Sequence, residues 1–333
     1  MEHISLEQEV EAFCQNPARR FIPTTIGLST LREQLKIEQS KPVWRHKTIV
    51  YDKKVRIPAG KRTINVRFMY PAQTDPSQKL PVLFYIHGGQ FISGDALIYD
   101  KLIRELTVRS KVALVFPEYD LAPESQAPVQ QEEINYIFSR LPQLAAECRL
   151  DLDRLIVCAD DVGAKFAVNL ALDQAMRSIK IYKMAFICPV VNRNFDTQSY
   201  YAYAGGYVTT REQMKFAWKQ YLGEENYVAN PLAESPLRLD LDELGQLPET
   251  LLITAEADVV RDEGEAMAQK MRDAGVKVAS IRFQGTIHDF VVYNALDQTN
   301  NCRLAMNILT DWIKPKSQAR KSRKRTFLEY GEQ

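Results

Sequence analysis

Cysteine, histidine and long apolar runs are scarce in this sequence. Its 333 residues include only five cysteines and four histidines. The cysteines are odd in number and scattered, which predicts neither a disulfide framework nor a paired metal-binding motif; they are Cys14, Cys148, Cys158, Cys188 and Cys302. No apolar run approaches the roughly 18 residues of a membrane helix, and the mixed, charged start does not resemble a signal peptide. We therefore expect a cytoplasmic protein without a membrane partner.

An excess of charge of one sign is also lacking. The 43 lysines and arginines are balanced by 42 aspartates and glutamates, which leaves a net charge of +1. This balance gives no electrostatic reason to expect a nucleic-acid partner. The exception is residues 314–333, a basic stretch poor in apolar residues that is predicted to be a flexible tail. The sequence leaves open both the binding of a polyanion by this tail and a homodimer.

Apolar residues make up 45% of the chain, enough for a sizeable core, and they recur as alternating strands and helices. Two runs, 48–57 and 62–70, are predicted to pair as a hairpin. The later strands are predicted at 81–86, 112–116, 155–158, 184–191, 251–254 and 278–283, with helices at 97–108, 132–148, 262–274 and 301–313 between and after them. This alternation is typical of a mostly parallel sheet with helices on both faces.

Two segments do not follow the alternation and are predicted to form a cap. Residues 1–45 carry apolar residues at helical spacing, and residues 192–247 are rich in aromatics. We expect one α/β domain over 46–313, with 192–247 as an insertion in it. A pocket is expected between the cap and the carboxyl ends of the strands.

One stretch predicts a sharp turn between a strand and a helix. The apolar run that begins at Leu155 stops at Ala159, and a helix is predicted to open at Gly163. Small residues at these two positions allow strand and helix to approach closely, as the pattern Gly-x-Ser-x-Gly does around a catalytic nucleophile. The nucleophile position of that pattern holds Asp161.

Three further motifs follow predicted strands. His87-Gly88-Gly89-Gln90 comes after the first buried strand, Asp258 after the strand at 251–254, and His288 after the last strand. Ligands of doubly wound sheets bind at the carboxyl ends of the strands. The chain order of turn, acid and histidine is the order expected for a catalytic triad on such a sheet.

With these motifs the sequence resembles the α/β-hydrolase fold, specifically the hormone-sensitive-lipase-like group of carboxylesterases. The matching segments are His87–Gln90, Tyr119–Glu124, Ala159–Ala164, Asp258–Gly264 and His288–Phe290. The sequence departs from the group at Gln90, Asp120, Ala159 and Asp161, and at Asp289, where the group has glycine. The resemblance implies an eight-stranded, mostly parallel sheet with helices on both faces and a helical cap.

The resemblance also implies roles for individual residues. Asp161, His288 and Asp258 would stand where the group has its Ser-His-Asp triad. The backbone N–H groups of an oxyanion hole would come from Gly88, Gly89, Gln90 and Val162. Asp160 would brace the turn by hydrogen bonds, and Asp289 and Glu256 could add negative charge near His288, which favours the imidazolium.

Asp161 makes an ordinary serine-esterase mechanism unfavourable. A carboxylate that attacks an ester forms an anhydride, and its low pKa, about 4, makes it a better leaving group than the alkoxide. One interpretation is an acid/base site of Asp161, His288 and Asp258 that activates water directly or carries out lyase or cyclase chemistry on a small apolar acyl or carbonyl compound.

Two other interpretations remain open. Asp161 could attack a saturated carbon, as in dehalogenases and epoxide hydrolases, and form an alkyl-enzyme ester that His288-activated water hydrolyses. Alternatively the protein is an inactive pseudo-esterase that binds a small ligand or a protein partner, with Asp161 acting only as a helix N-cap. No metal or organic cofactor is expected, because the sequence spacing shows no ligand cluster and no phosphate-binding loop.

Overall fold

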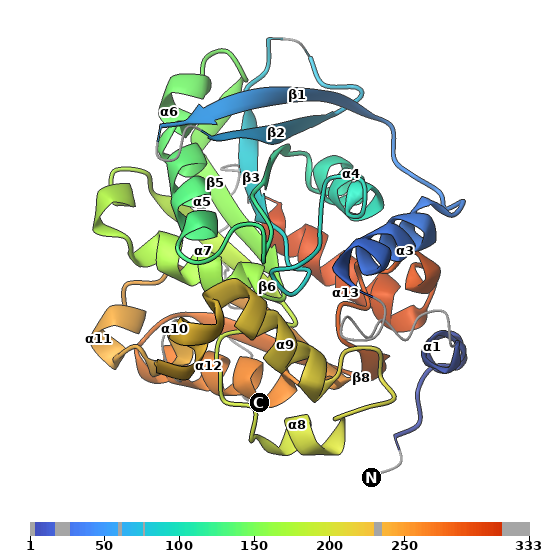
Figure 1. Cartoon of the computed structure of the whole chain (residues 1–333). Coiled ribbons are helices and arrows are strands. Elements are labelled where there is room, and N and C mark those ends of the chain that lie inside the picture. The colour runs from blue at the N-terminus through green and yellow to red at the C-terminus, as the bar shows by residue number, and fades with distance from the viewer. Residues whose placement is uncertain (1–3, 17–26, 59–61, 76, 230–234, 315–333) are drawn as a thin grey trace, which may run out of the picture.

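A single eight-stranded sheet forms the centre of the molecule in the computed structural model, which describes residues 4–16, 27–58, 62–75, 77–229 and 235–314 (Figure 1). The strand order is β1-β2-β4-β3-β5-β6-β7-β8. The strands are β1 (Thr48–Ile57), β2 (Arg62–Pro71), β3 (Leu80–Ile86), β4 (Ala113–Glu118), β5 (Leu150–Asp160), β6 (Ile181–Ile187), β7 (Thr250–Ala257) and β8 (Val278–Ile287). Among the described strands only the β1–β2 and β2–β4 pairs are antiparallel, so the predicted mostly parallel sheet is confirmed.

Helices cover both faces of the sheet. In Figure 1, α5 and α7 lie on one side of the central strands, and α4 and α13 lie on the other. The described helices are α1 (Gln8–Gln15), α3 (Leu28–Ser40), α4 (Asp100–Ser110), α5 (Val129–Ser139), α6 (Leu141–Leu144), α7 (Gly163–Leu172), α8 (Gln198–Ala202), α9 (Arg211–Leu222), α10 (Glu224–Ala229), α11 (Leu241–Leu244), α12 (Arg261–Asp273) and α13 (Asn300–Ile313). None of the helices in the described part of the chain is both long and apolar enough to cross a bilayer.

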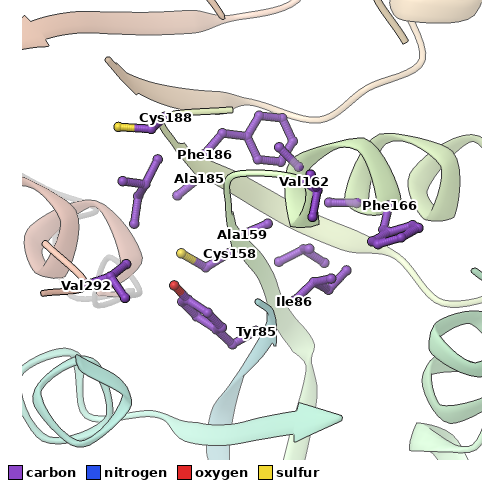
Figure 2. Packing of buried hydrophobic residues seen from close by; sticks show 14 of the residues in the cluster. Tyr85, Ile86, Cys158, Ala159, Val162, Phe166, Ala185, Phe186, Cys188 and Val292 are labelled. Carbon is purple, nitrogen blue, oxygen red and sulfur yellow. The ribbon is translucent and has the colours of Figure 1, made fainter. Parts of the chain in front are cut away.

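The core lies where the central strands are apolar on both faces. Every residue of β3 is buried, as is the second half of β5. Figure 2 shows how Ile86, Ala159, Val162 and Phe166 pack where β3 and β5 meet α7. Burial on both sides explains why these strands read as continuous apolar runs instead of alternating ones.

Most predicted elements differ from the structure by a few residues at their ends, and in two of them a local backbone feature explains the difference. The helix predicted over 132–148 is divided into α5 and α6, with Pro142 near the start of α6. Proline lacks the N–H of a helix interior and its ring clashes with the preceding turn, so one continuous helix cannot form here. The strand predicted over 184–191 ends at Ile187, because the next residue, Cys188, has a left-handed backbone with φ 44°.

Helix α3 covers the carboxyl ends of the strands and is held at both of its ends. Arg32 donates to the carbonyls of Ile92 and Ala122 at 2.7 and 2.8 Å, and to both carboxylate oxygens of Glu124. At the other end, the buried Gln39 amide donates to two backbone carbonyls at 2.9 and 3.0 Å. These bonds place α3 over the loops that carry the predicted site residues.

The division of the chain into cap and catalytic domain stays a prediction. Of the predicted cap, residues 17–26 and 230–234 lie outside the described residues, as do residues 59–61 of the predicted hairpin connection. The predicted flexible tail also lies outside them from residue 315 onward.

Candidate active site

Asp161 occupies the turn between β5 and α7 with a strained backbone. Its φ of 46° lies in the left-handed region, which side chains other than glycine rarely adopt. Its N–H donates to the carbonyl of Ile187 at 3.0 Å, and its own carbonyl accepts from the N–H of Val190 at 2.9 Å. A Cβ added to Gly163 would lie 2.2 Å from the carbonyl oxygen of Ile86, so the close approach predicted at this position is present.

The carboxylate of Asp161 points to the glycine loop and not to the helix. The Gln90 backbone N–H donates to Asp161 Oδ2 at 2.5 Å. The residue that flanks the start of α7 is Val162, and no side chain caps this helix. The interpretation of Asp161 as a helix N-cap is therefore wrong, because its hydrogen bond crosses to another strand's loop.

His288 lies at the centre of three carboxylates. Its Nδ1 is 2.9 Å from Asp258 Oδ2, a hydrogen bond, while Asp258 Oδ1 accepts from the N–H of Val260. Its Nε2 is 3.6 Å from Asp161 Oδ1 and 3.4 Å from Asp289 Oδ2. The structure thus brings together the three residues predicted as a triad and adds Asp289 as a fourth member.

These carboxylates set the protonation of the imidazole. Burial alone would lower the pKa of His288, but Asp258, Asp289 and Asp161 outweigh it and raise that pKa well above 6.5. Burial and the neighbouring carboxylates also raise the pKa of Asp289 well above its ordinary value, although His288 opposes this. The imidazolium expected from nearby acids is therefore the favoured form at neutral pH, and it can act as an acid but not as a base. Glu256 is engaged elsewhere, since its carboxylate accepts from the N–H of Gly285 at 2.7 Å.

Asp160 is buried behind the turn and braces it. Its two oxygens accept hydrogen bonds from the hydroxyl groups of Tyr85 and Tyr99, at 2.8 and 2.6 Å. Burial raises the pKa of Asp160 to about 7 even though these bonds oppose the shift. The side chain holds β3, β5 and the start of α4 together, which is the structural role that the sequence indicates.

The glycine loop presents fewer backbone donors than expected. The chain is left-handed at Gly89, Gln90 and Phe91 in succession, which turns the Gln90 N–H toward Asp161. The N–H of Gly88 lies 3.2 Å from the Tyr99 hydroxyl, so this predicted oxyanion donor is directed away from the site. Gly88 serves instead by its size, because an added Cβ would lie 2.5 Å from the Cβ of Asp161. The roles predicted for Gly89 and for Val162, which is buried next to Asp161, stay predictions.

His87 supports the glycine loop from behind. Its ring stacks on Tyr119 with 4.1 Å between the centroids, and the Tyr119 hydroxyl donates to the His87 carbonyl at 2.6 Å. Burial lowers the pKa of His87 to about 4, so the ring is neutral at pH 7. This explains why the loop needs a histidine before its glycines although that histidine does not reach the triad.

Cys188 is a site residue that the sequence does not reveal. It directly follows β6 and lies beside His288. One donor atom each from Cys188, His288 and Asp289 lie within 4.8 Å of one another. Spacing rules cannot detect this group, because the fold joins residues about 100 positions apart.

A small cavity of about 70 Å³ lies between α3 and the glycine loop. Its walls are largely apolar and include Leu31, Leu35, Ile92, Ile98, Val292 and Tyr293, with Gln90 and Asp289 at the end nearest the triad. Gln90 also bridges to the segment before α9, since its amide lies 3.4 Å from the Thr209 hydroxyl. Asp161 and His288 do not line the cavity and are only 0% and 2% exposed.

Comparisons with known proteins agree with this architecture. The family model of the alpha/beta hydrolase fold matches residues 83–292. Vegetative-specific protein H5 of Dictyostelium discoideum is 33% identical over 266 residues, which cover 76% of this chain and 77% of that protein. A putative alpha/beta hydrolase of Acanthamoeba polyphaga mimivirus is 32% identical over 241 residues, or 71% of this chain and 68% of its own length.

Solved esterases share the fold over almost the whole chain. The crystal structure of a thermostable esterase from Pseudomonas putida superimposes with a TM-score of 0.84 at 29% identity, covering 94% of this chain and 98% of that one. An esterase from Pyrobaculum calidifontis gives a TM-score of 0.80 at 27% identity, covering 93% and 98%. The chain belongs to the esterase-like alpha/beta hydrolase fold family.

Proposed function

We propose that Asp161 takes the place of the nucleophilic serine, and that the protein binds a small, mostly apolar acyl or carbonyl compound without hydrolysing it. The observation that carries the proposal is the 2.5 Å hydrogen bond from the Gln90 N–H to Asp161 Oδ2. In the family resemblance this N–H belongs to the oxyanion hole. A permanent carboxylate at that donor competes with the oxyanion that an ester develops in its transition state.

The position of Asp289 supports the same proposal. This side chain lines the cavity and is 3.4 Å from His288, so it separates the cavity from the imidazole. Its φ of 53° is left-handed, the conformation for which glycine, the residue of the related group, is best suited. A compound bound in the cavity therefore meets Asp289 before it reaches Asp161 or His288.

The protonation of His288 weighs against direct activation of water. A general base must be unprotonated, and the surrounding carboxylates raise the pKa of His288 well above 6.5. Of the acid/base chemistries considered for Asp161, His288 and Asp258, those in which His288 donates a proton fit this site better than those in which it removes one.

One observation favours a second candidate, nucleophilic attack by Asp161 on a saturated carbon. Oδ2 is held by the Gln90 N–H while Oδ1 has no hydrogen-bond partner, so the two oxygens are free to act as carbonyl and nucleophile. Oδ1 would bond to the carbon as a halide leaves with the bonding electrons. Water would then add to Cγ and lose a proton to His288, which can accept it only after the ester removes the charge of Asp161 that helps to keep the imidazole protonated. The alcohol would leave while the Gln90 N–H stabilises the negative charge on Oδ2.

Hydrolysis of short aryl esters by four proteins tests the proposal. We expect no turnover by the wild type or by Asp161→Asn, because neither has a competent nucleophile for an ester. Asp161→Ser combined with Asp289→Gly restores a serine and opens the cavity to it, so this double variant should exceed the wild type by at least about 100-fold, the scale of general-base assistance. Asp161→Ser alone should remain well below the double variant.

The same proteins separate the alternatives. Ester turnover by the wild type that disappears in Asp161→Asn would contradict the proposal. Halide release from short haloalkanes by the wild type but not by Asp161→Asn would assign the second candidate instead. In that case His288→Gln should accumulate an alkyl adduct that mass spectrometry places on Asp161.

A further inference from the structure

A buried group of nitrogen, oxygen and sulfur atoms surrounds the imidazole of His288. Cys188 and Asp289 each place a donor atom within 4.8 Å of one another and of the imidazole, and Asp161 Oδ1 is 3.6 Å from Nε2. These residues come from the ends of three parallel strands, β5, β6 and β8. We propose that Cys188, His288 and Asp289 form a binding site for a divalent transition-metal ion such as zinc, with Asp161 beside it.

Two donor atoms of this group have no other partner. His288 Nε2 and Asp161 Oδ1 make no hydrogen bond, although their side chains are 98% and 100% buried. Asp289 Oδ1 is likewise buried without a partner. Buried polar atoms are almost always paired, and a metal ion bound to His288 and Asp289 would satisfy these two side chains together.

The distances suit a tetrahedral ion. Zinc bonds to nitrogen and oxygen ligands are about 2.0–2.2 Å, so two such ligands on one ion are about 3.3–3.6 Å apart. His288 Nε2 is 3.4 Å from Asp289 Oδ2 and 3.6 Å from Asp161 Oδ1. Asp289 thus already has the spacing of a zinc ligand relative to the imidazole, and the Cys188 donor atom lies within 4.8 Å of both of these residues.

The other ends of the ligands are already oriented. Asp258 accepts a hydrogen bond from His288 Nδ1 at 2.9 Å, which directs Nε2 toward the group. Asp161, whose second oxygen accepts from the Gln90 N–H, is a fixed neighbour of this site and not one of its ligands. A carboxylate behind a metal-bound histidine is the usual support of that zinc ligand.

The chemistry of the donors selects the ion. A thiolate and an imidazole favour zinc or cobalt over magnesium and calcium, which take oxygen ligands. On binding, the ion replaces the proton of the Cys188 thiol, the proton on His288 Nε2 and any proton that Asp289 carries, and these protons are released to solvent. Its two positive charges offset those of the Asp161 and Asp289 carboxylates, which are buried beside one imidazole.

Cobalt is a suitable probe because its spectrum reports the ligands. The full-length protein is first dialysed against EDTA and then titrated with Co²⁺. We expect saturation at one ion per chain, with visible bands of a tetrahedral ion and a thiolate-to-cobalt charge-transfer band in the near ultraviolet. Zinc should displace the cobalt and remove both signals.

Variants identify the ligands. Cys188→Ser should lose the charge-transfer band and bind at least about 10-fold more weakly, whereas Cys158→Ser should keep the band. Cys158 is an appropriate control because it is equally buried, but it lies beside Tyr85 and apart from Cys188 (Figure 2). Asp289→Asn, which keeps the size of the side chain, should weaken binding while circular dichroism remains that of the wild type.

Three results would overturn the proposal: no saturable uptake of Co²⁺ or Zn²⁺ by the wild type, a thiolate band that persists in Cys188→Ser, or an equal loss of the band in Cys158→Ser. The proposal goes beyond the function proposed above. Its failure is distinguishable from failure of that function, because the ester assay of Asp161→Ser with Asp289→Gly is made in EDTA.

Discussion

At the scale of single residues, Asp161 and His288 each use one polar atom for a hydrogen bond and direct the other toward the centre of the site. One carboxylate oxygen of Asp161 accepts a hydrogen bond from the Gln90 N–H, and the other lies toward His288. His288 gives Nδ1 to Asp258 and turns Nε2 toward two further carboxylates. Because three acids surround one imidazole inside the protein, the charge of His288 is the property that most directly tests this geometry.

We expect His288 to remain protonated through neutral pH. Asp258, Asp289 and Asp161 raise its pKa well above 6.5, whereas burial lowers the pKa of His87 to about 4. Imidazole nitrogen shifts in NMR spectra should show one histidine still charged at pH 7.5 and one neutral down to about pH 4. The pKa of His288 should fall in Asp289→Asn, and a midpoint at or below 6.5 in the wild type would contradict the geometry.

The raised pKa of His288 also makes the free energy of unfolding depend on pH. An unfolded histidine titrates near 6.5, and the pKa of folded His288 is higher. Its contribution to the free energy of unfolding is therefore complete below pH 6.5 and is lost as the pH rises through the folded pKa. Urea titrations at several pH values should show this slope in the wild type and a smaller one in His288→Gln.

For single residues, the sequence predicts only part of the site. The motifs identify Asp161, His288 and Asp258 because each follows a strand. They do not predict that Gly88 turns its N–H to a tyrosine, or that Cys188 joins the triad. Both depend on backbone torsion and on contacts between strands, which single motifs do not encode.

The elements that carry the site are held by close backbone contacts. Helix α7 crosses β3 where Gly163 lies, and an added Cβ would be 2.2 Å from the Ile86 carbonyl oxygen. The turn that positions Asp161 therefore depends on the absence of a side chain two residues later.

Gly163→Ala should destabilise the protein by about 1–3 kcal/mol or more, the range for overpacked sites. Gly205→Ala is a matched control, because a Cβ there has no atom within 4 Å. Urea unfolding followed by circular dichroism measures both. Equal midpoints for the two variants would show that the contact at Gly163 is relieved without cost.

Element prediction succeeded where the apolar pattern was continuous. The buried strands β3, β5 and β7 were found because both of their faces are covered, which leaves a plain apolar run. Prediction failed at ends that a local backbone feature determines. Pro142 divides the helix predicted over 132–148, and the left-handed Cys188 ends β6 early.

At the scale of the whole molecule, the hydrogen bonds that hold α3 in place also fix one wall of the cavity. Arg32 joins this N-terminal helix to the loops after β3 and β4, and part of its guanidinium is shielded from water. The helix thus forms one wall of the cavity, and Asp289 lines the cavity next to His288.

Arg32→Ala should release α3 without unfolding the rest. Hydrogen exchange measured by mass spectrometry should become at least about 10-fold faster over residues 28–40, because hydrogen bonds to a charged group contribute about 1.5–3 kcal/mol. The protection of β3 and β5 should not change. Loss of protection throughout the sheet would mean that α3 supports the entire fold and not only the cavity.

The aromatic cluster beneath the glycine loop gives the molecule a built-in optical reporter. The indole of Trp218 in α9 is fully buried, and its ring lies 4.9 Å from that of Phe91, the residue after Gln90. Any event that moves the Gln90 peptide also moves Phe91 and changes the surroundings of this indole. Intrinsic fluorescence can therefore follow occupation of the site in the unlabelled protein, with the exposed Trp44 as an internal reference for solvent effects.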